Sequence, residues 1–408
     1  MQFSRSVLAV IMLGASGCSV PQATEDPMRP DSDYLFRTGP YLLLGERGEV
    51  FVAIKAELDA APVVEWWLEE GSSPAPQRVT AVADDDLWVA TLQNLPIGPK
   101  ISYRVVSSEG TTQTFRFRAG SEPGQPFRFA AFGDTRTGHE VHRAVVDAVV
   151  EFEPDFLVHT GDMVEVGGIE GQWDLFFQIE RPLLARTPII PSIGNHDEGA
   201  RGYYRRYFLQ DYWTEGRRYY AYDWGHLRIV AVDVAIECRR GCAQYDFADE
   251  VLADTHGPDI FAMMTLHFPP YSSGYHGSDL GVQVSISELA RRHGVELVVA
   301  GHDHHYERTK PIDGTTYIVS GSAGAPIREV RPRPFTAVAR TEPHFVLVDV
   351  DANEMKLRTI NLAAETFDRT TLGPSPPIAD AEAPTAQRNE PIETESREDS
   401  SSRTQSPD

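Results

Sequence analysis

Side chains that bind metals follow a series of apolar segments along this sequence. Asp134 and Asp162 each come after a Gly that ends such a segment, and later segments end in Asn195-His196, His267 and His302-Asp303-His304. A single Asp in such a place usually belongs to a turn, but five such loops in order indicate a metal centre. Carboxylate, amide and imidazole ligands together suit Mn, Fe or Zn, whereas an all-oxygen set suits Mg or Ca. If two ions are bound, one carboxylate has to bridge them.

Two kinds of element alternate from residue 127 onward, and they must position these side chains. Apolar strand patterns occur at 127–132, 156–159, 189–193, 227–232, 262–266 and 297–300, and helical periodicity at 139–152, 172–184 and 285–293. This alternation predicts an α/β domain with a largely parallel sheet, which we place at residues 127–362. Ligands in such folds gather beyond the carboxyl ends of the strands, so we expect the five loops to meet.

A different pattern covers residues 36–120, where short apolar or alternating runs are separated by Gly, Pro, Asp and Asn. Val, Ile, Thr and aromatic residues dominate the runs, which predicts an all-β sandwich. The segment 92–98 followed by Tyr103 resembles the late-strand corner of a fibronectin type III-like domain. No catalytic cluster occurs in this block, so we expect a scaffold or a lid. Residues 121–126 are typical of a linker, and the chain is predicted to be multidomain.

The start of the chain has the features of an export signal. Arg5 precedes a short apolar run at 7–13, and the segment ends in Ala-Ser-Gly-Cys18, which resembles the lipobox of bacterial lipoproteins. We therefore expect residues 1–18 to be a signal peptide, Cys18 to carry the lipid, and residues 19–35 to be a spacer. The expected location is a membrane anchor in the periplasm or at the cell surface, with simple secretion as the alternative.

Two further segments are interpreted from composition. Residues 363–408 are rich in Pro, Ser, Thr, Glu and Asp, and we expect a disordered acidic tail because such a segment buries too little apolar surface. Cys238 and Cys242 are expected to form a small disulfide, which an oxidising compartment permits. A zinc site is the alternative for these two thiols, although no His lies beside them in the sequence.

The overall charge narrows the range of partners. The chain of 408 residues has 37 Lys and Arg against 60 Asp and Glu, a formal net charge of −23. A surface this acidic repels nucleic acid and anionic lipid, so we expect neither as a partner, apart from membrane contact through a lipid on Cys18. An anionic substrate remains compatible with this charge if local cations reverse the field at the site.

The chemically capable residues lie in motifs that resemble those of a known family. The motifs GDT at 133–135, GDMVE at 161–165, GNHD at 194–197, His267 and GHDHHYER at 301–308 resemble the calcineurin-like metallophosphoesterase superfamily. An N-terminal β-sandwich together with GHxHxYER is similar to the purple acid phosphatases. The resemblance covers residues 36–361. It implies a phosphoester hydrolase with two divalent metal ions, whose catalytic domain is a four-layer α-β-β-α sandwich.

The resemblance also implies a role for each matching residue. Asp134 and His304 would hold the first metal, Asp162 would bridge the two ions, and the second would be held by Asn195, His267 and His302. His196 would contact the phosphate and protonate the leaving oxygen, as the catalytic residue. Substrate would lie against Asn195, His196 and Arg136. The two ions would supply a metal-bound hydroxide by lowering the pKa of a water, and would neutralise charge on the phosphate.

Two positions depart from the family pattern. Arg136 stands where many members have a ligating His, and Glu165 stands where purple acid phosphatases have a ligating Tyr. The first metal therefore lacks both usual fourth ligands, and Glu165, His139 or a water are the alternatives. Arg136 cannot be a ligand because guanidinium stays protonated; it either meets a phosphate oxygen or is a solvated loop residue. Without a tyrosinate, we expect divalent ions and no purple colour.

These inferences predict an exported enzyme that acts on phosphoesters. The function expected first is an acid phosphatase-like phosphomonoesterase. A phosphodiesterase or nucleotide hydrolase on the same metals is the close alternative, and a non-catalytic surface-binding lipoprotein is the alternative from another class of function.

Overall fold

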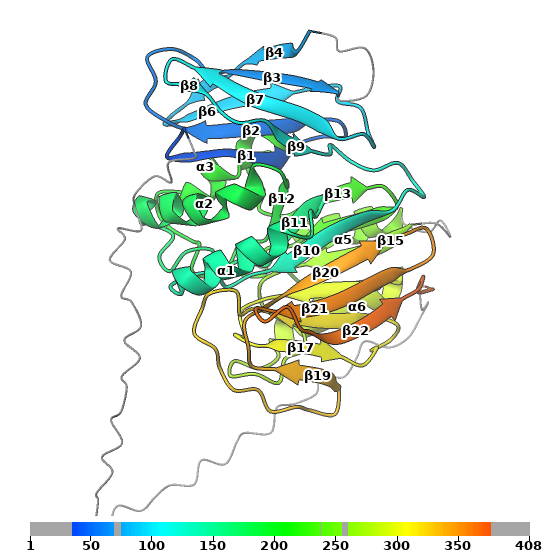
Figure 1. The fold of residues 1–408 in the computed structure, drawn as a ribbon. Helices are drawn as coiled ribbons and strands as arrows, with labels where there is room; N and C mark the ends of the chain where they lie inside the picture. Colours follow the sequence, from blue (N-terminus) through cyan, green and yellow to red (C-terminus); the bar gives the residue numbers. More distant parts are fainter. Residues whose placement is uncertain (1–34, 69–74, 237, 255–259, 377–408) are drawn as a thin grey trace, which may run out of the picture.

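The computed structural model describes residues 35–68, 75–236, 238–254 and 260–376. They form three sheets and two helical layers (Figure 1). The predicted signal peptide, lipobox and spacer fall on residues 1–35, of which 1–34 lie outside the described residues. The part of the chain that the structure describes contains no helix with the length and apolar character of a membrane span.

The largest sheet has ten strands in the order β22-β21-β20-β10-β11-β12-β1-β2-β6-β5. Its strands are β1 (Thr38–Leu44), β2 (Val50–Lys55), β5 (Val82–Asp84), β6 (Leu87–Leu92), β10 (Phe127–Phe132), β11 (Phe156–His159), β12 (Ile189–Pro191), β20 (His344–Val350), β21 (Met355–Asn361) and β22 (Thr366–Leu372). The strands β10, β11, β12 and β1 run parallel, and the strands on either side of them pair antiparallel.

The second sheet has seven strands in the order β13-β14-β15-β16-β18-β17-β19. Its strands are β13 (Tyr220–Trp224), β14 (Leu227–Ala231), β15 (Phe261–Thr265), β16 (Leu297–Ala300), β17 (Tyr306–Thr309), β18 (Thr316–Ser320) and β19 (Thr336–Arg340). The central strands β14, β15, β16 and β18 are parallel. Both sheets thus have the parallel centre that the alternating sequence pattern predicts.

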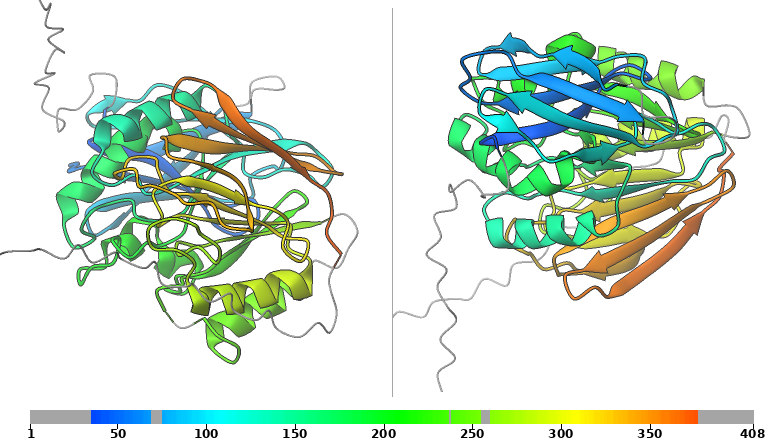
Figure 2. Two further views of the ribbon diagram at one scale, coloured as in Figure 1. Left: turned by 90° about the horizontal axis from the view of Figure 1, so that it is seen from below. Right: turned by 45° about the horizontal axis from the view of Figure 1, so that its top comes forward.

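Helices cover the outer faces of these two sheets. The helices are α1 (His139–Val150), α2 (Glu170–Leu184), α3 (Tyr203–Tyr207), α4 (Gln210–Trp213), α5 (Ala243–Ala253) and α6 (Leu280–His293). In Figure 2, α5 and α6 lie on the opposite side of the molecule from α1 and α2. The helix α6 begins where the Asp279 carboxylate accepts the Val282 N–H at 2.9 Å and ends at Gly294, whose φ of 67° is left-handed.

The alternation of side chains along β10 shows how the layers are held together. Phe129 and Ala131 pack into the core between the two sheets, whereas Ala130 and Phe132 pack against α1 and α2. A third core joins the seven-stranded sheet to α5 and α6. Because successive strand residues point to opposite faces, one strand serves two cores. The four-layer α/β domain and the β-rich N-terminal block predicted from the sequence are confirmed.

The N-terminal block shares a sheet with the α/β domain. The strand β1 pairs in parallel with β12, with Leu43 opposite Ile189, so β1, β2, β6 and β5 extend the ten-stranded sheet. The third sheet closes the sandwich over them and consists of β3 (Val63–Leu68), β4 (Gln77–Thr80), β7 (Ile101–Ser107), β8 (Gly110–Thr111) and β9 (Phe115–Phe117). The sequence pattern separated the two blocks but did not predict this shared sheet.

The predicted tail begins too early. Residues 366–372 form β22, which pairs with β21 along most of its length. Asp368 is buried against Tyr306 and Arg308, and this polar contact explains how a segment of low apolar content is held in the fold. The remainder of the predicted tail, from residue 377, lies outside the described residues.

The expected disulfide is also wrong in the structure. No disulfide joins Cys238 to Cys242. The sulfur of Cys242 instead accepts the N–H of Tyr245 at 3.4 Å and caps the first turn of α5. This role holds the Cys242 side chain toward the helix end. The metal-capable group found among the described residues does not include either thiol.

Candidate metal centre

Five loops converge at the carboxyl ends of β10, β11, β12, β15 and β16. They bring together all six residues predicted as ligands: Asp134, Asp162, Asn195, His267, His302 and His304. Three of these residues have left-handed backbones, with φ of 56° at Asp134, 53° at Asp162 and 69° at His302. Such angles are uncommon outside Gly and persist where surrounding contacts enforce them. Contacts within the site, and not local conformational preference, therefore determine the backbone of these loops.

Gly161 shows how closely the loops approach one another. Its φ is 95°, and a Cβ placed there would lie 2.7 Å from the Gly194 nitrogen and 2.8 Å from Nδ1 of His267. Any larger residue would push the β11 loop away from the β12 loop and from His267. The Gly that precedes Asp162 is thus required for the loops to meet.

Asp197 ties the β11 and β12 loops together from beneath. Its buried carboxylate accepts N–H groups from Gly194 at 2.8 Å, Asp162 at 2.8 Å and Met163 at 2.8 Å. Burial and the negative charge of Asp162 raise the pKa of Asp197 to about 7. The GNHD motif contains Asp197, but the sequence alone indicates no role for it. Its role depends on backbone N–H groups from two loops, which come together only in the folded structure.

Asp162 lies at the centre of the group. Its Oδ1 is 3.3 Å from Nε2 of His267 and accepts the His196 backbone N–H at 2.9 Å. Ligand atoms of Asp134, Asp162 and His267 all lie within 4.8 Å of one another. Burial opposes ionisation of Asp162, but His267 and the N–H of His196 outweigh it, so the pKa of Asp162 is lowered. The carboxylate is anionic here.

His267 directs one ring nitrogen into the group. Its Nδ1–H donates to the Thr160 carbonyl at 2.8 Å, which leaves Nε2 facing Oδ1 of Asp162 and, at 3.1 Å, Oδ1 of Asn195. Burial lowers the pKa of His267, but the charges of Asp162 and Asp134 prevail and raise it to about 9. The carboxylates thus favour a positive charge near Nε2 of His267. A bound cation would supply such a charge.

Asp134 provides a direct test of whether a cation fits. Its Oδ2 accepts the His302 backbone N–H at 2.9 Å, whereas its buried Oδ1 has no hydrogen-bond partner. Nε2 of His304 lies 3.6 Å from that oxygen, and the His304 Nδ1–H donates to the Pro326 carbonyl at 2.8 Å. Burial lowers the pKa of His304 to about 4, so its Nε2 carries a lone pair. A lone carboxylate oxygen beside a lone-pair nitrogen suits a metal ion.

His302 completes the group from the β16 loop. Its ring centroid is 5.1 Å from that of His267, 4.6 Å from that of Phe268 and 4.2 Å from that of His276. Burial, reinforced by His267, lowers the pKa of His302 to about 2, so this ring is neutral. His276 was missed by sequence reasoning because it follows no strand. The Asp303 carboxylate holds its loop by accepting the His276 N–H at 2.9 Å.

His196 stands at the accessible side of the centre. Its Nδ1–H donates to the Glu165 carbonyl at 2.8 Å, and its Nε2 lies 4.0 Å from Oδ2 of Asp162. The side chain remains 28% exposed, so a molecule entering from solvent meets it. The ring is therefore oriented by the protein and open to a ligand.

Arg136 is buried within the centre. Its Nε donates to Oδ2 of Asp162 at 3.2 Å, and its Nη1 pairs with Oε2 of Glu165. Of the two alternatives for Arg136, the solvated loop residue is wrong, because two carboxylates hold the buried guanidinium in place. Glu165, one of the alternatives for a fourth ligand, faces Arg136. His139, the other side chain considered, lines a cavity beside Arg136.

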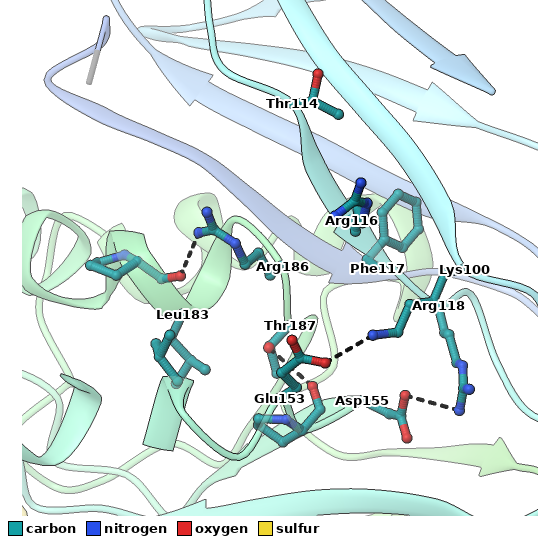
Figure 3. A pocket seen from close by; sticks show the side chains of 13 residues that line it. Lys100, Thr114, Arg116, Phe117, Arg118, Glu153, Asp155, Leu183, Arg186 and Thr187 are labelled. Atoms are coloured by element: carbon teal, nitrogen blue, oxygen red, sulfur yellow. Dashed lines mark hydrogen bonds and ion pairs between the residues drawn. The ribbon is translucent and has the colours of Figure 1, made fainter. Parts of the chain in front are cut away.

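A separate cavity of about 200 Å³ lies where β9 meets the loop after α2 (Figure 3). Lys100 and Arg118 line it and pair with Glu153 at 3.0 Å and Asp155 at 3.3 Å. None of the predicted site residues contributes to it. This cavity belongs to the junction of the two blocks and not to the metal centre.

The part of the chain that contains the metal centre matches a known protein family. Residues 127–306 match the family model described as calcineurin-like phosphoesterase. Among curated proteins, similarity extends to "Probable inactive purple acid phosphatase 1" of Arabidopsis thaliana, 24% identical over 76% of this chain and 62% of that protein. The "Nucleotide pyrophosphatase/phosphodiesterase" of Hordeum vulgare is 26% identical over 52% of this chain and 73% of its own.

Solved structures share the architecture. The purple acid phosphatase PPD1 from yellow lupin (Lupinus luteus) seeds superposes with a TM-score of 0.72 at 20% identity, over 82% of this chain and 74% of that chain. PhoD superposes with a TM-score of 0.66 at 11% identity, over 85% and 90%. At these identities the likeness concerns the fold.

Proposed function

Because residues 127–306 belong to the calcineurin-like phosphoesterase family, we propose that this protein is a metal-dependent phosphoester hydrolase of the purple acid phosphatase and PhoD type. The observation that carries the proposal is the buried Oδ1 of Asp134. It lacks a hydrogen-bond partner and lies beside His304, in a group where Asp134, Asp162 and His267 offer ligand atoms within 4.8 Å. Such a group is costly to bury unless a cation binds it.

Different residues would bind the two metal ions. Asp162, Asn195, His267 and His302 would hold one divalent ion, and Asp134 and His304 face the position of a second. An ion bound there would polarise a phosphate oxygen and lower the pKa of a water. Mn, Fe(II) and Zn are the ions that this mixture of oxygen and nitrogen donors suits.

His196 would act on the leaving group. Its ring is fixed through Nδ1 by the Glu165 carbonyl, so Nε2 is the atom available to a substrate. Partial exposure beside Asp162 allows Nε2 to contact a phosphate oxygen and to give a proton to the departing alkoxide. We propose a phosphate monoester as the substrate class. Its compact dianionic group would be attracted by the bound metal and by the Arg136 guanidinium, which lies beside Asp162.

Export and lipidation form a separate part of the proposal. The support for them is the sequence pattern alone: Arg5, the apolar run at 7–13, and Cys18 after Ala-Ser-Gly. Mass spectrometry of the membrane fraction after expression in a bacterium tests it. A diacylglyceryl adduct on Cys18 is the expected result, and an unmodified, retained N-terminus contradicts it.

Hydrolysis by the metal-stripped full chain tests the enzymatic proposal. An aryl phosphate monoester and the matching diester are supplied with Mn, Zn, Fe(II) or Mg in turn. We expect metal-restored turnover that favours the monoester, and the Asp349→Asn variant, altered far from the centre, serves as the control. A preference for the diester would indicate a phosphodiesterase. Bound metal without turnover of either ester would instead indicate a binding protein.

A further inference from the structure

The two oxygens of the Asp162 carboxylate meet different partners. Oδ1 faces Nε2 of His267 at 3.3 Å and accepts the His196 N–H at 2.9 Å. Oδ2 accepts the Nε–H of Arg136 at 3.2 Å. A carboxylate that bridges two ions through both of its oxygens presents one oxygen to each ion. Here the protein's own guanidinium already binds the second oxygen.

We propose that Arg136 is a tethered cation that holds the Asp134/His304 side of the centre, so that the site binds one divalent ion tightly and a second only weakly. The tight position is the one bordered by His267, Asn195 and His302. The inference rests on the proposed metal dependence and deepens it, because it makes the two metal positions unequal.

Charge and geometry both support this inequality. A guanidinium remains protonated at all working pH values and offers no lone pair, so it cannot become a ligand. Its hydrogen bond occupies one lone-pair direction of Oδ2, so a second ion would have to share that oxygen with the guanidinium. Its fixed charge also repels a divalent ion a few ångströms away, in a site that little water can screen. Asp134 Oδ1 and His304 Nε2 remain as donors on that side, which leaves a weak site rather than none.

Glu165 anchors the tethered cation. Its Oε2 pairs with Nη1 of Arg136, and its side chain is 40% exposed. Beside this pair lies a cavity of about 310 Å³, lined by Arg136, His139, Gln172 and Phe176 among others. The cavity gives the Arg136 side chain space to turn away from Asp162 without unfolding the loop. A second ion that takes Oδ2 of Asp162 as a ligand would therefore have to displace the Arg136 contacts to Asp162 and Glu165.

Metal stoichiometry of the full chain tests the inference without relying on turnover. Metal-free protein is dialysed against increasing Mn(II), the bound ion is counted by mass spectrometry, and paramagnetic resonance detects spin-coupled Mn(II) pairs. We expect one ion per chain first, and a second ion with a Kd at least roughly tenfold weaker because of the fixed charge. The coupled signal should appear only with the second ion.

Variants separate the charge of Arg136 from its bulk. Arg136→Met removes the charge and should tighten the second Kd by roughly tenfold or more, whereas Arg136→Lys keeps the charge and should retain the gap. Glu165→Gln loosens the anchor and should tighten the second Kd by a smaller factor; weaker binding would instead make Glu165 a ligand and contradict its anchoring role. Arg128→Met is the matched control, since Arg128 pairs with Asp349 at 2.6 Å. It should change neither Kd.

Two results would overturn the inference alone. If wild type binds two ions with equal affinity and Arg136→Met does not change this, the guanidinium does not hold the second position. If Arg136→Met and Arg136→Lys give the same stoichiometry curve, charge is not the cause. The complete absence of metal binding in wild type would overturn the proposed function as well. That outcome is distinct, because equal binding of two ions leaves the proposed function intact.

Discussion

Nε2 of His142 lies 2.7 Å from Oε1 of Glu180, and neither side chain reaches solvent. The pair joins α1 to α2, His142 lines the cavity beside Arg136, and Oε2 of Glu180 has no hydrogen-bond partner. Burial raises the pKa of Glu180 to about 8. Burial, with the nearby Arg143, lowers the pKa of His142 to about 3. One proton is therefore bound by the folded pair across the whole range between these values.

This pair predicts a stability profile with a plateau. Unfolded Glu and His have pKa values of 4.5 and 6.5, so between them the unfolded pair also binds one proton and stability does not change. Above pH 6.5 the unfolded pair loses that proton while the folded pair keeps it until about pH 8. Stability should fall there by about 1.4 kcal/mol per pH unit, about 2 kcal/mol in all.

Urea unfolding between pH 5 and 8.5 measures this profile. Other groups contribute to the total, so the informative quantity is the difference between wild type and Glu180→Gln. The variant has no carboxyl to deprotonate, and its stability should not show the loss above pH 6.5. Parallel profiles for the two proteins above pH 6.5 would show that Glu180 does not retain its proton in the fold.

The contacts of Lys55 predict how strongly the N-terminal block is attached to the α/β domain. Its Nζ in β2 lies 2.7 Å from Asp174 and 2.6 Å from Glu170, both in α2, and 2.8 Å from the Tyr207 hydroxyl. The Lys55 side chain is 14% exposed and that of Asp174 is 7% exposed. Lys55→Met therefore leaves the buried Asp174 carboxylate paired with Arg37 at 3.3 Å, a side chain that is 58% exposed. We expect a loss of about 3 kcal/mol in the free energy of unfolding, measured in urea.

Lys100→Met is the matched control for Lys55→Met. Lys100 pairs with Glu153 at 3.0 Å, but the two side chains are 45% and 77% exposed. Solvent screens such a pair, so its removal should cost less than about 1 kcal/mol. Equal losses for the two variants would mean that the Lys55 cluster does not attach β2 to α2 more strongly than a surface ion pair does.

Substitutions of His196 and Asp162 should both lower turnover but should differ in their effect on metal content. His196→Ala removes the group oriented by the Glu165 carbonyl but no residue of the Asp134, Asp162 and His267 group. Turnover should fall by about 10²-fold or more while metal content stays unchanged. Asp162→Asn removes the central charge and should lose both metal and turnover. Steady-state kinetics together with metal analysis check this, and a His196→Ala protein that loses its metal would contradict the assignment.

The part of the centre that could be predicted from the sequence is the part encoded locally. Asp134 and Asp162 each follow a strand within three residues, so the strand pattern alone placed them at the carboxyl edge of a sheet. His276 and the anchoring of Arg136 depend on contacts between loops, for which no periodicity exists. The pairing of Leu43 with Ile189 is equally non-local, because an alternating strand pattern predicts an exposed and a buried face but not a partner.

The last strand, β22, lies in the segment that low apolar content predicts to be a tail. A polar residue, Asp368, fixes this strand in the fold. Asp368 Oδ2 accepts the Tyr306 hydroxyl at 2.6 Å and the Arg308 Nε–H at 2.7 Å, and its Oδ1 accepts the Arg308 Nη2–H at 2.9 Å. Tyr306 and Arg308 belong to β17, two residues beyond His304. Asp368 therefore fixes the strand that follows the last predicted ligand.

Asp368→Ala should thus lower the free energy of unfolding by about 3 kcal/mol, because it leaves the buried Tyr306 hydroxyl and the Arg308 guanidinium without their acceptor. Thr371→Ala, at an exposed position of the same strand, should change it by less than about 0.5 kcal/mol. Urea unfolding of the two variants measures the difference. If Asp368→Ala is as stable as Thr371→Ala, β22 does not support β17, and the folded part of the chain would end energetically before residue 366.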